Sequence, residues 1–194
     1  MSAPLTIGLT GGIAAGKSEA LAAFERLGAA TISSDAVVHE LLDSEPLRGR
    51  LVERWGEEVA PSGRVDRARV GEIVFADPGQ LSWLEEQVHP LVGTRIGAWL
   101  SALPEGTDTA VVEVPLLFEA EMEKAFDTTV AIVTADELRR ERAEARGHAL
   151  VVEREARQLS QPEKAERADH VVVNDGSVED LERHLSELLG KLRG

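Results

Sequence analysis

Residues 5–18 hold the most restrictive feature of this chain, a glycine-rich phosphate-binding sequence directly after a short apolar segment. The segment Leu5–Thr10 has the composition of a buried strand, and Gly11–Ser18 then matches the pattern G-x-x-x-x-G-K-[ST]. A helical pattern of apolar residues follows, as this kind of loop requires. We call Gly11–Ser18 the P-loop. It predicts nucleotide binding without naming a reaction, and the alternative is a chance match in a glycine-rich turn.

Each residue type in the P-loop has a chemical reason. Successive backbone N–H groups of a concave loop can bind the phosphates of a nucleotide, and glycines let the phosphates approach. The helix that follows directs the positive end of its dipole toward them. The Lys17 ammonium can reach the terminal phosphates, and the Ser18 hydroxyl is a hard oxygen suited to Mg²⁺. ATP and Mg²⁺ are therefore the predicted cofactors. The predicted nucleotide contacts are Gly11, Gly12, Ile13, Ala14, Ala15, Gly16, Lys17 and Ser18.

Composition limits the class of protein. The 194 residues, of which 43% are hydrophobic, are enough for one domain with a proper core and a small additional lobe. No apolar run has membrane-spanning length, and no secretory signal precedes the first predicted strand. Cysteine is absent, which excludes disulfides and thiolate metal sites and suits the cytoplasm. We expect a cytoplasmic monomer.

The net charge of −14 bears on possible partners. A strongly acidic surface repels nucleic acids and anionic membranes, so neither is a predicted partner. ATP is an anion as well, so its site must be locally positive. The chain has only four lysines, one of which is Lys17, and six of its arginines fall between Arg139 and Arg157.

Short β-type segments alternate with helical patterns along most of the chain. This alternation predicts an α/β fold of three layers, in which a five-stranded parallel sheet lies between helices. The predicted strands are residues 5–10, 30–33, 109–114, 128–133 and 170–174. Parallel strands present their carboxyl ends at the same edge of a sheet, so the residues that follow these strands should gather near the P-loop.

Asp35 follows the second predicted strand and opens a helical pattern. It could be an N-cap, which is a common role for aspartate before an apolar periodic run. Its place at the carboxyl edge of the sheet instead favours a base that takes the proton of an acceptor hydroxyl, and the two roles are compatible. His39, one turn later, is expected at the surface or in packing rather than in catalysis.

Residues 46–103 interrupt the alternation with an almost entirely helical pattern, which predicts a lobe inserted between two strands of the sheet. Asp77 and Pro78 have the positions of an N-cap and the first helical residue. The helix that follows is expected to break at His89-Pro90 and to resume at Leu91. At least two of the three tryptophans of this segment, Trp55, Trp83 and Trp99, are expected to pack between helices.

Glu113 lies near the end of the third predicted strand. An acid in this position can hold Mg²⁺ or its water shell in a P-loop enzyme, and the alternative is an outward charge on an edge strand. The apolar loop Pro115–Glu119 follows. It could form a wall of a substrate pocket or simply cover the core.

Residues 135–158 read as two helical stretches that resemble a hinged lid. Thr134 with Glu137 predicts a capping box for a helix over residues 135–146, and Gly147-His148 ends it. The alternative is a solvated helical hairpin, because the segment also contains six acids. Its arginines are Arg139, Arg140, Arg142, Arg146, Arg154 and Arg157.

The turn Asn174-Asp175-Gly176 ends the last predicted strand, again at the edge that carries the P-loop. Ser177 with Asp180 then predicts the cap of a final amphipathic helix.

From Leu5 to Gly176 the chain resembles the dephospho-CoA kinase family. The P-loop alone is shared by many folds, whereas the loop Pro115–Glu119, His89-Pro90 and the spacing from Gln158 to Asn174 are far more particular. The segments that carry the resemblance are residues 9–18, Ser34-Asp35-Ala36 with His39, residues 73–75, residues 89–92, residues 114–119, Arg154 with Gln158, Glu163-Lys164, Ala168-Asp169 and residues 174–176.

The resemblance implies ATP-dependent phosphorylation of the ribose 3′-hydroxyl of dephospho-CoA, the last step of coenzyme A biosynthesis. It implies a core of residues 1–45, 104–134 and 165–194, a CoA-binding lobe of residues 46–103 and a lid of residues 135–164. The implied catalytic residues are Asp35, Lys17 and Arg142. Further nucleotide contacts would be Arg142, Asn174 and Gly176. The implied substrate contacts are Asp35, His89, Pro115, Leu116, Leu117 and Phe118, and Ser18 and Glu113 would face the metal.

The chain also departs from the family pattern. Where the family usually has Asp-Ala-Asp, this chain has Ser33-Ser34-Asp35, so only the second acid remains. Glu19 replaces a hydroxyl in the first helical turn, and we expect it to face away from the phosphates. Two other functions stay open: a kinase for another small acceptor such as a nucleoside or nucleotide, and a regulatory protein that binds ATP without catalysis.

Overall fold

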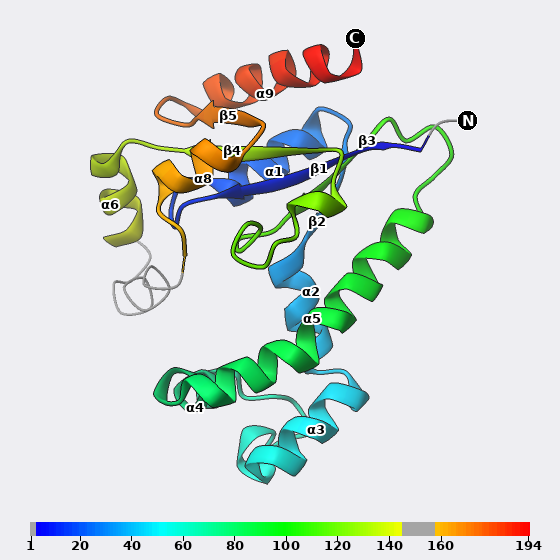
Figure 1. Cartoon of the computed structure of the whole chain (residues 1–194), viewed down its shortest axis with the longest axis vertical. Coiled ribbons are helices and arrows are strands. Elements are labelled where there is room, and N and C mark those ends of the chain that lie inside the picture. Colours follow the sequence, from blue (N-terminus) through cyan, green and yellow to red (C-terminus); the bar gives the residue numbers. More distant parts are fainter. Residues whose placement is uncertain (1–2, 145–157) are drawn as a thin grey trace. The chain divides into compact units, whose positions relative to one another are not determined.

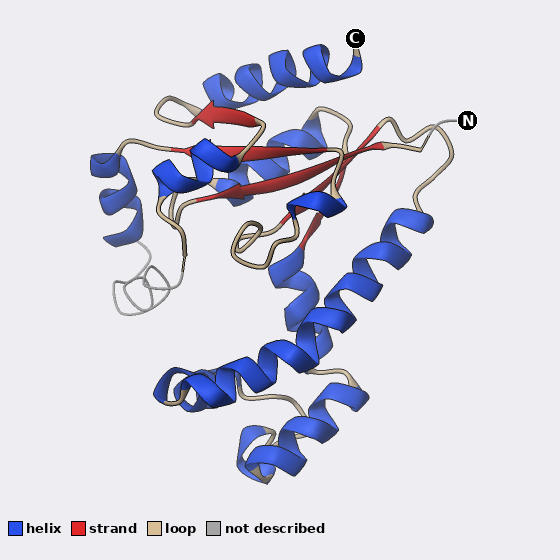
Figure 2. Ribbon diagram, viewed as in Figure 1, coloured by secondary structure: helices blue, strands red, loops and turns tan. Residues whose placement is uncertain are grey.

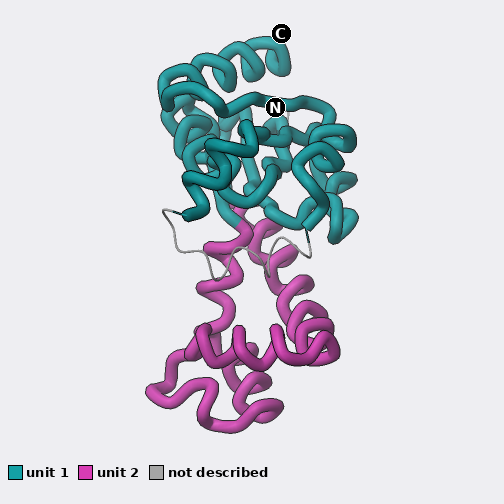
Figure 3. The backbone as a smooth tube through the Cα atoms, turned by 90° about the vertical axis from the view of Figure 1, so that its left-hand side faces the viewer, with its two compact units in different colours: residues 1–33, 103–194 teal, residues 34–102 magenta. Residues whose placement is uncertain are grey.

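The structure is a computed structural model that describes residues 3–144 and 158–194 (Figure 1). The chain divides into two compact units, one formed by Met1–Ser33 and Leu103–Gly194 and the other by Ser34–Ala102 (Figure 3). The first unit contains the sheet, and the second is helical. Within the described ranges, no helix has both the length and the apolar character needed to cross a membrane.

A five-stranded sheet forms the centre of the first unit, and all its strands are parallel, as predicted (Figure 2). The strands are β1 (Leu5–Gly11), β2 (Ala30–Ser33), β3 (Thr109–Glu113), β4 (Thr128–Val133) and β5 (His170–Val173). Their order in the sheet is β2-β3-β1-β4-β5, and each boundary lies within one residue of its prediction. Because β1 is the central strand, the P-loop that follows it lies at the middle of the carboxyl edge.

Alternate residues of β1 face opposite sides of the sheet, and helices cover both sides. Ile7 and Leu9 are fully buried in the core that β1 forms with α1 and α9. Thr10 faces the other side, where its hydroxyl lies 3.5 Å from Nζ of Lys164 on α8. Three layers result. Among the described residues of this unit, the helical segments are α1 (Lys17–Arg26), η2 (Glu123–Ala125), α6 (Asp136–Glu144), α8 (Gln161–Arg167) and α9 (Val178–Arg193).

The ends of α1 follow from its sequence. After the last helical turn Gly28 adopts φ +86°, and the N–H of Ala29 donates to the carbonyl of Phe24 at 3.0 Å, a common glycine-terminated helix end. In the first turn, the Glu19 carboxylate pairs with Arg26 at 3.0 Å. This ion pair directs Glu19 along the helix toward its far end, away from the P-loop, as we expect.

The predicted cap of the last helix is confirmed. Ser177 Oγ accepts a hydrogen bond from the N–H of Asp180, and the Asp180 carboxylate accepts one from the N–H of Ser177. The helix then buries Leu181, Leu185 and Leu188 against the core, as its amphipathic pattern predicts.

The second unit consists of helices, and the predicted aspartate cap at Asp77 is present, because its carboxylate accepts a hydrogen bond from the N–H of Gly79. Asp66, for which the sequence predicts no cap, also accepts hydrogen bonds from the first N–H groups of the helix that follows it. Trp55 and Trp83 pack edge to face with their ring centroids 5.2 Å apart, which confirms the predicted packing role for these two tryptophans. The helical segments are α2 (Ser34–Leu42), α3 (Glu45–Trp55), η1 (Glu57–Val59), α4 (Arg67–Ala76) and α5 (Pro78–Ser101).

The predicted break at His89-Pro90 is wrong, because α5 continues through Pro90 as one helix (Figure 1). A proline inside a helix removes one backbone hydrogen bond and crowds the preceding turn. Here Val88, Val92 and Ile96 are buried on one face of α5, which packs against α2 and α4. This tertiary packing outweighs the local cost of the proline.

Candidate active site

The P-loop begins at the end of β1 and leads directly into α1. Gly16 precedes α1 with φ +95°, in the left-handed region that favours glycine, and a Cβ at this position would collide with the side-chain amide nitrogen of Asn174. Ala14 also lies in the left-handed region, with φ +60°. Such a conformation costs a non-glycine residue roughly 1–3 kcal/mol and persists only where neighbouring groups hold it. Contacts around the P-loop must therefore stabilise its shape.

Lys17 is the first residue of α1, and its side chain turns back over the P-loop. Nζ donates hydrogen bonds to the carbonyl oxygens of Gly11 at 3.1 Å and Gly12 at 3.0 Å. The ammonium therefore lies beside the first glycines of the loop. Ser18, the next residue, is exposed on the first turn of α1.

Two buried side chains hold the carbonyl oxygen of Ala15. Nδ2 of Asn174 and Oγ1 of Thr134 each donate to it at 2.9 Å. Asn174 is only 6% exposed, so its side chain faces the backbone of the P-loop. Gly176 lies two residues further on, exposed in the turn between β5 and α9. A direct contact of either residue with a nucleotide stays a prediction.

The predicted capping box of Thr134 and Glu137 is wrong. The Thr134 hydroxyl bonds to the P-loop instead, and α6 begins only at Asp136. Sequence spacing alone could not reveal that the end of β4 turns this side chain inward. Of the predicted lid, the break at Gly147-His148 lies outside the described residues, as do Arg146, Arg154 and Arg157.

Two arginines of α6 lie at different points along the P-loop. Nη1 of Arg142 lies 3.3 Å from the carbonyl oxygen of Asn174 and 3.5 Å from the Thr134 hydroxyl, and a Cβ at Gly16 would be 3.8 Å from it. Nη1 of Arg139 would be 3.5 Å from a Cβ at Gly12. The structure thus brings Arg142 to the P-loop, and it also brings Arg139, for which the sequence predicts no particular role.

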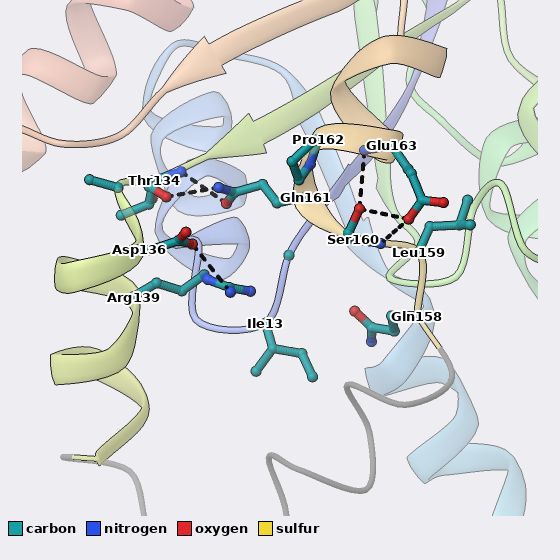
Figure 4. A pocket seen from close by; sticks show the side chains of 12 residues that line it. Ile13, Thr134, Asp136, Arg139, Gln158, Leu159, Ser160, Gln161, Pro162 and Glu163 are labelled. Atoms are coloured by element: carbon teal, nitrogen blue, oxygen red, sulfur yellow. Dashed lines mark hydrogen bonds and ion pairs between the residues drawn. The ribbon is translucent and has the colours of Figure 1, made fainter.

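A cavity of about 600 Å³ opens beside the first residues of the P-loop (Figure 4). Gly12 and Ile13 form one side of it, Arg139 another, and the start of α8 a third. Arg139 forms an ion pair with Asp136 at 3.3 Å on the wall of this cavity. The remaining lining residues are Thr134, Ala135, Gln158, Leu159, Ser160, Gln161, Pro162 and Glu163.

Gln161 is a cavity residue that sequence reasoning missed. Its amide oxygen accepts from the N–H of Thr134 at 3.0 Å, and its amide nitrogen donates to the Thr134 carbonyl at 2.8 Å (Figure 4). Its amide oxygen would also lie 3.4 Å from a Cβ at Gly12. The only sequence signal was its place just after Ser160, which caps α8 in a box with Glu163.

The apolar loop after β3 has two kinds of residue. Leu117 and Phe118 are 0% and 4% exposed, so they cover the core, whereas Pro115 and Leu116 are half-buried. The loop is held by Lys164, a fully buried lysine that donates to the Pro115 carbonyl. Substrate contact by this loop stays a prediction.

Lys164 also forms a buried ion pair. Its Nζ lies 3.0 Å from Oε1 of Glu119, and the same oxygen accepts from the N–H of Leu159 at 2.7 Å. Burial lowers the pKa of the Lys164 ammonium, and the Glu119 carboxylate opposes this effect. The pair therefore connects α8 to the loop after β3, and Glu119 also holds Leu159, which precedes α8 beside the cavity.

We expect Lys164→Met to lower the free energy of unfolding by about 3–5 kcal/mol, because it leaves the charge of Glu119 buried without its partner. The double variant Lys164→Met with Glu119→Leu should be clearly more stable than this single variant. Urea unfolding at neutral pH measures both, and Lys124→Met is a control at an exposed lysine. A double variant less stable than Lys164→Met would contradict this account.

Glu113 is the last residue of β3, and it is 7% exposed. The alternative of an outward charge on an edge strand is wrong, because β3 lies between β2 and β1. Glu113 pairs in register with Leu9, two residues before the P-loop begins. A buried carboxylate thus stands at the carboxyl edge on the strand next to the P-loop, and its contact with a metal stays a prediction.

Asp35 and His89 belong to the second unit. Asp35 is exposed in the first turn of α2, two residues after β2 ends, and its carboxylate accepts no hydrogen bond from any described residue. It is the second residue of the helix, so it does not occupy the N-cap position that we considered. His89 is exposed on α5, and His39 is exposed on α2, as expected.

Comparisons with known proteins give a consistent result. The model of the family described as "Dephospho-CoA kinase" matches residues 5–180. The dephospho-CoA kinase of Synechococcus sp. (strain JA-3-3Ab) is 37% identical over 209 residues, which cover 95% of this chain and 91% of that protein. The structure titled TT1252 from Thermus thermophilus has a TM-score of 0.86, 35% identity and full coverage of both chains. Dephospho-CoA kinase from Campylobacter jejuni has a TM-score of 0.72 and 25% identity, and the match covers 97% of this chain and 96% of that one.

Proposed function

The chain belongs to the dephospho-CoA kinase family, and from this premise we propose which of its residues carry out the reaction. It is a P-loop kinase that uses ATP to phosphorylate dephospho-CoA in coenzyme A biosynthesis. We propose the ribose 3′-hydroxyl as the acceptor and CoA and ADP as the products of this last biosynthetic step. The observation that carries the assignment of residues is the P-loop with Lys17 folded over it at the middle of the carboxyl edge.

The phosphates of ATP are proposed to bind along Gly11–Ser18. The loop's backbone N–H groups and the start of α1 supply positive partial charge, and Lys17 supplies a full charge beside the first glycines. Asn174 shapes this site through the Ala15 carbonyl, and Gly176 would border the nucleotide further along the same edge.

We propose that the Ser18 hydroxyl would coordinate Mg²⁺ and that Glu113 would hold a water molecule of the Mg²⁺ hydration shell. Hard oxygens suit this ion, and in phosphoryl-transfer sites it takes only one or two protein ligands besides phosphates and water. When bound, Mg²⁺ would neutralise charge on the β- and γ-phosphates.

Asp35 is proposed as the base. Its carboxylate would accept the proton of the 3′-hydroxyl while that oxygen forms a bond to the γ-phosphorus and the bond to ADP breaks. Two residues span at most about 7 Å, so Asp35 stays close to the end of β2. Its exposure leaves both carboxylate oxygens open to an acceptor.

Arg142 is proposed to stabilise the negative charge of the phosphoryl group as it moves. Its guanidinium already lies beside Gly16, and an always-charged planar donor suits this role. Arg139, beside Gly12 and the cavity, is a second positive group for the same purpose. Phosphoryl transfer needs mainly positioning and charge stabilisation, and these groups supply both.

Each unit, considered by itself, has residues that we propose as contacts of dephospho-CoA. In the first unit, Pro115 and Leu116 are the partly exposed residues of the loop after β3, with Leu117 and Phe118 behind them. In the second unit, Asp35 and His89 are exposed, and the helices of residues 46–103 would form the CoA-binding lobe. A cytoplasmic location and a monomeric state remain predictions from composition.

A coupled ADP-release assay with dephospho-CoA, adenosine and AMP as acceptors tests this function. We expect turnover with dephospho-CoA to exceed that with the other two by far, and removal of Mg²⁺ with EDTA to abolish it until Mg²⁺ is restored. Faster turnover with AMP would instead support a nucleotide kinase. ATP binding without acceptor-dependent ADP release would support a regulatory protein, and metal-independent turnover would remove the proposed role of Ser18.

A further inference from the structure

Thr134 has no role in the function argued above, although it bonds to the P-loop at the end of β4. We infer that Thr134 is a positioning residue that holds the P-loop and Arg142 in one arrangement, and that Gln161 fixes Thr134 in place. We call Thr134 and Gln161 the P-loop brace. The inference rests on the proposed binding of ATP phosphates at the P-loop.

The Thr134 hydroxyl is the centre of the brace. It is 2% exposed, and its oxygen lies 2.9 Å from the Ala15 carbonyl, 3.3 Å from the Asn174 carbonyl and 3.5 Å from Nη1 of Arg142. A hydroxyl has one hydrogen to donate and can accept as well. The short distance assigns the hydrogen to Ala15, which leaves a lone pair of Thr134 for Arg142. One buried hydroxyl thus links a P-loop carbonyl to the arginine of α6.

Gln161 fixes the backbone of the same residue. Its amide forms two hydrogen bonds with Thr134, at 3.0 Å to the N–H and 2.8 Å to the carbonyl, so both backbone groups are held (Figure 4). The same amide oxygen would lie 3.4 Å from a Cβ at Gly12, and both residues line the cavity. The brace therefore bonds to the P-loop at Ala15 through Thr134 and faces it at Gly12 through Gln161.

The P-loop needs such support because of its backbone conformation. Ala14 and Gly16 both lie in the left-handed region, on either side of the Ala15 carbonyl that Thr134 and Asn174 hold. A strained segment keeps its conformation only when surrounding contacts fix it. Loss of the hydroxyl should let the loop sample other conformations, in which its N–H groups no longer converge on phosphate. The first effect should then be on ATP and not on dephospho-CoA.

Steady-state kinetics of Thr134→Val test the inference. Valine keeps the shape of threonine and removes only the hydroxyl, and we expect KM for ATP to rise about 5- to 30-fold, the range for loss of a buried hydrogen bond. KM for dephospho-CoA should change much less. Thr134→Ser keeps the hydroxyl and should restore KM for ATP nearly to that of the unchanged protein.

Thr129→Val is a matched control. Thr129 lies on the same strand, is 3% exposed and bonds through its hydroxyl to Asp169 at 2.8 Å, but it pairs in register with Gly8, before the P-loop begins. It should lose thermal stability much as Thr134→Val does while keeping KM for ATP. Equal kinetic changes in the two variants, or no rescue by Thr134→Ser, would overturn the inference.

Gln161→Met gives a second test, in which the substituted side chain is not fully buried. Gln161 is half-buried at the cavity wall, so this variant should fold even where Thr134→Val does not, and the same selective rise in KM for ATP is expected. A normal KM for ATP in Gln161→Met would contradict the brace. Lys17→Ala distinguishes a failure of the brace from a failure of the proposed ATP site. If ATP binding is unchanged in Lys17→Ala, the P-loop is not the ATP site. If Lys17→Ala weakens ATP binding but Thr134→Val and Gln161→Met do not, only the brace is wrong.

Discussion

Asp35→Asn should lower kcat by about 10²–10⁴-fold while leaving KM for ATP nearly unchanged, because a general base contributes a factor of this size. Asparagine has almost the same shape as aspartate but cannot take the proton of the acceptor hydroxyl. Asp35 is exposed and accepts no hydrogen bond from the described residues, so its loss should not destabilise α2. The coupled assay with varied ATP and dephospho-CoA separates the two constants.

Glu40→Gln is the matched control for this experiment. Glu40 is also an exposed acid of α2, but it pairs with Arg95 at 3.7 Å. An exposed ion pair contributes at most about 1 kcal/mol to stability, so kcat should not change in this variant. Near-normal turnover of Asp35→Asn would remove Asp35 as the base.

Arg142→Ala should lower kcat by about 10³–10⁵-fold, which is the effect of an arginine that stabilises a transferring phosphoryl group in P-loop enzymes. The guanidinium lies beside Gly16 and within 3.5 Å of the Thr134 hydroxyl, so it is already held at the P-loop. Arg142→Lys should recover only part of this loss, because lysine cannot reproduce the planar set of donors. Single-turnover kinetics at saturating ATP measure the chemical step directly.

Arg140→Ala serves as the control for Arg142. Arg140 lies on the same helix two residues earlier, and its side chain is exposed. Removal of its charge should therefore leave kcat within a small factor. A similar loss in Arg140→Ala and Arg142→Ala would mean that only the total positive charge of α6 matters. An Arg142→Ala variant with nearly full activity would leave Arg139 as the remaining candidate on α6.

The sheet and the P-loop could be predicted because their signals are local. Each strand is a short run of β-branched or small apolar residues, and all five boundaries fall within one residue of the prediction. The glycine pattern, Lys17 and the caps at Asp77 and Ser177 are also readable from neighbouring residues. Structure that is determined by interactions among neighbouring residues can therefore be predicted from a short stretch of sequence.

The remaining features depend on contacts between distant segments. Local rules predict that Pro90 ends a helix, but the packing of α5 keeps the helix continuous through this residue. They also predict that Thr134 caps a helix, but its hydroxyl donates to the P-loop carbonyl of Ala15 instead. No local rule predicts that Lys164 is buried, because its ion-pair partner Glu119 lies 45 residues earlier in the chain. No pattern within a short window contains such information.

The position of β1 at the centre of the sheet has a consequence for biosynthesis. Its hydrogen-bonding neighbours are β3 and β4, which begin only at Thr109 and Thr128. During translation the glycine-rich sequence leaves the ribosome before both of these strands, so β1 has neither neighbour to pair with until they have been made. High contact order of this kind slows folding and leaves apolar segments exposed meanwhile. The P-loop sequence is thus synthesised well before the sheet that shapes it into a nucleotide site can form. In that interval the apolar strand segments would be exposed, and a chaperone would be most useful to them then.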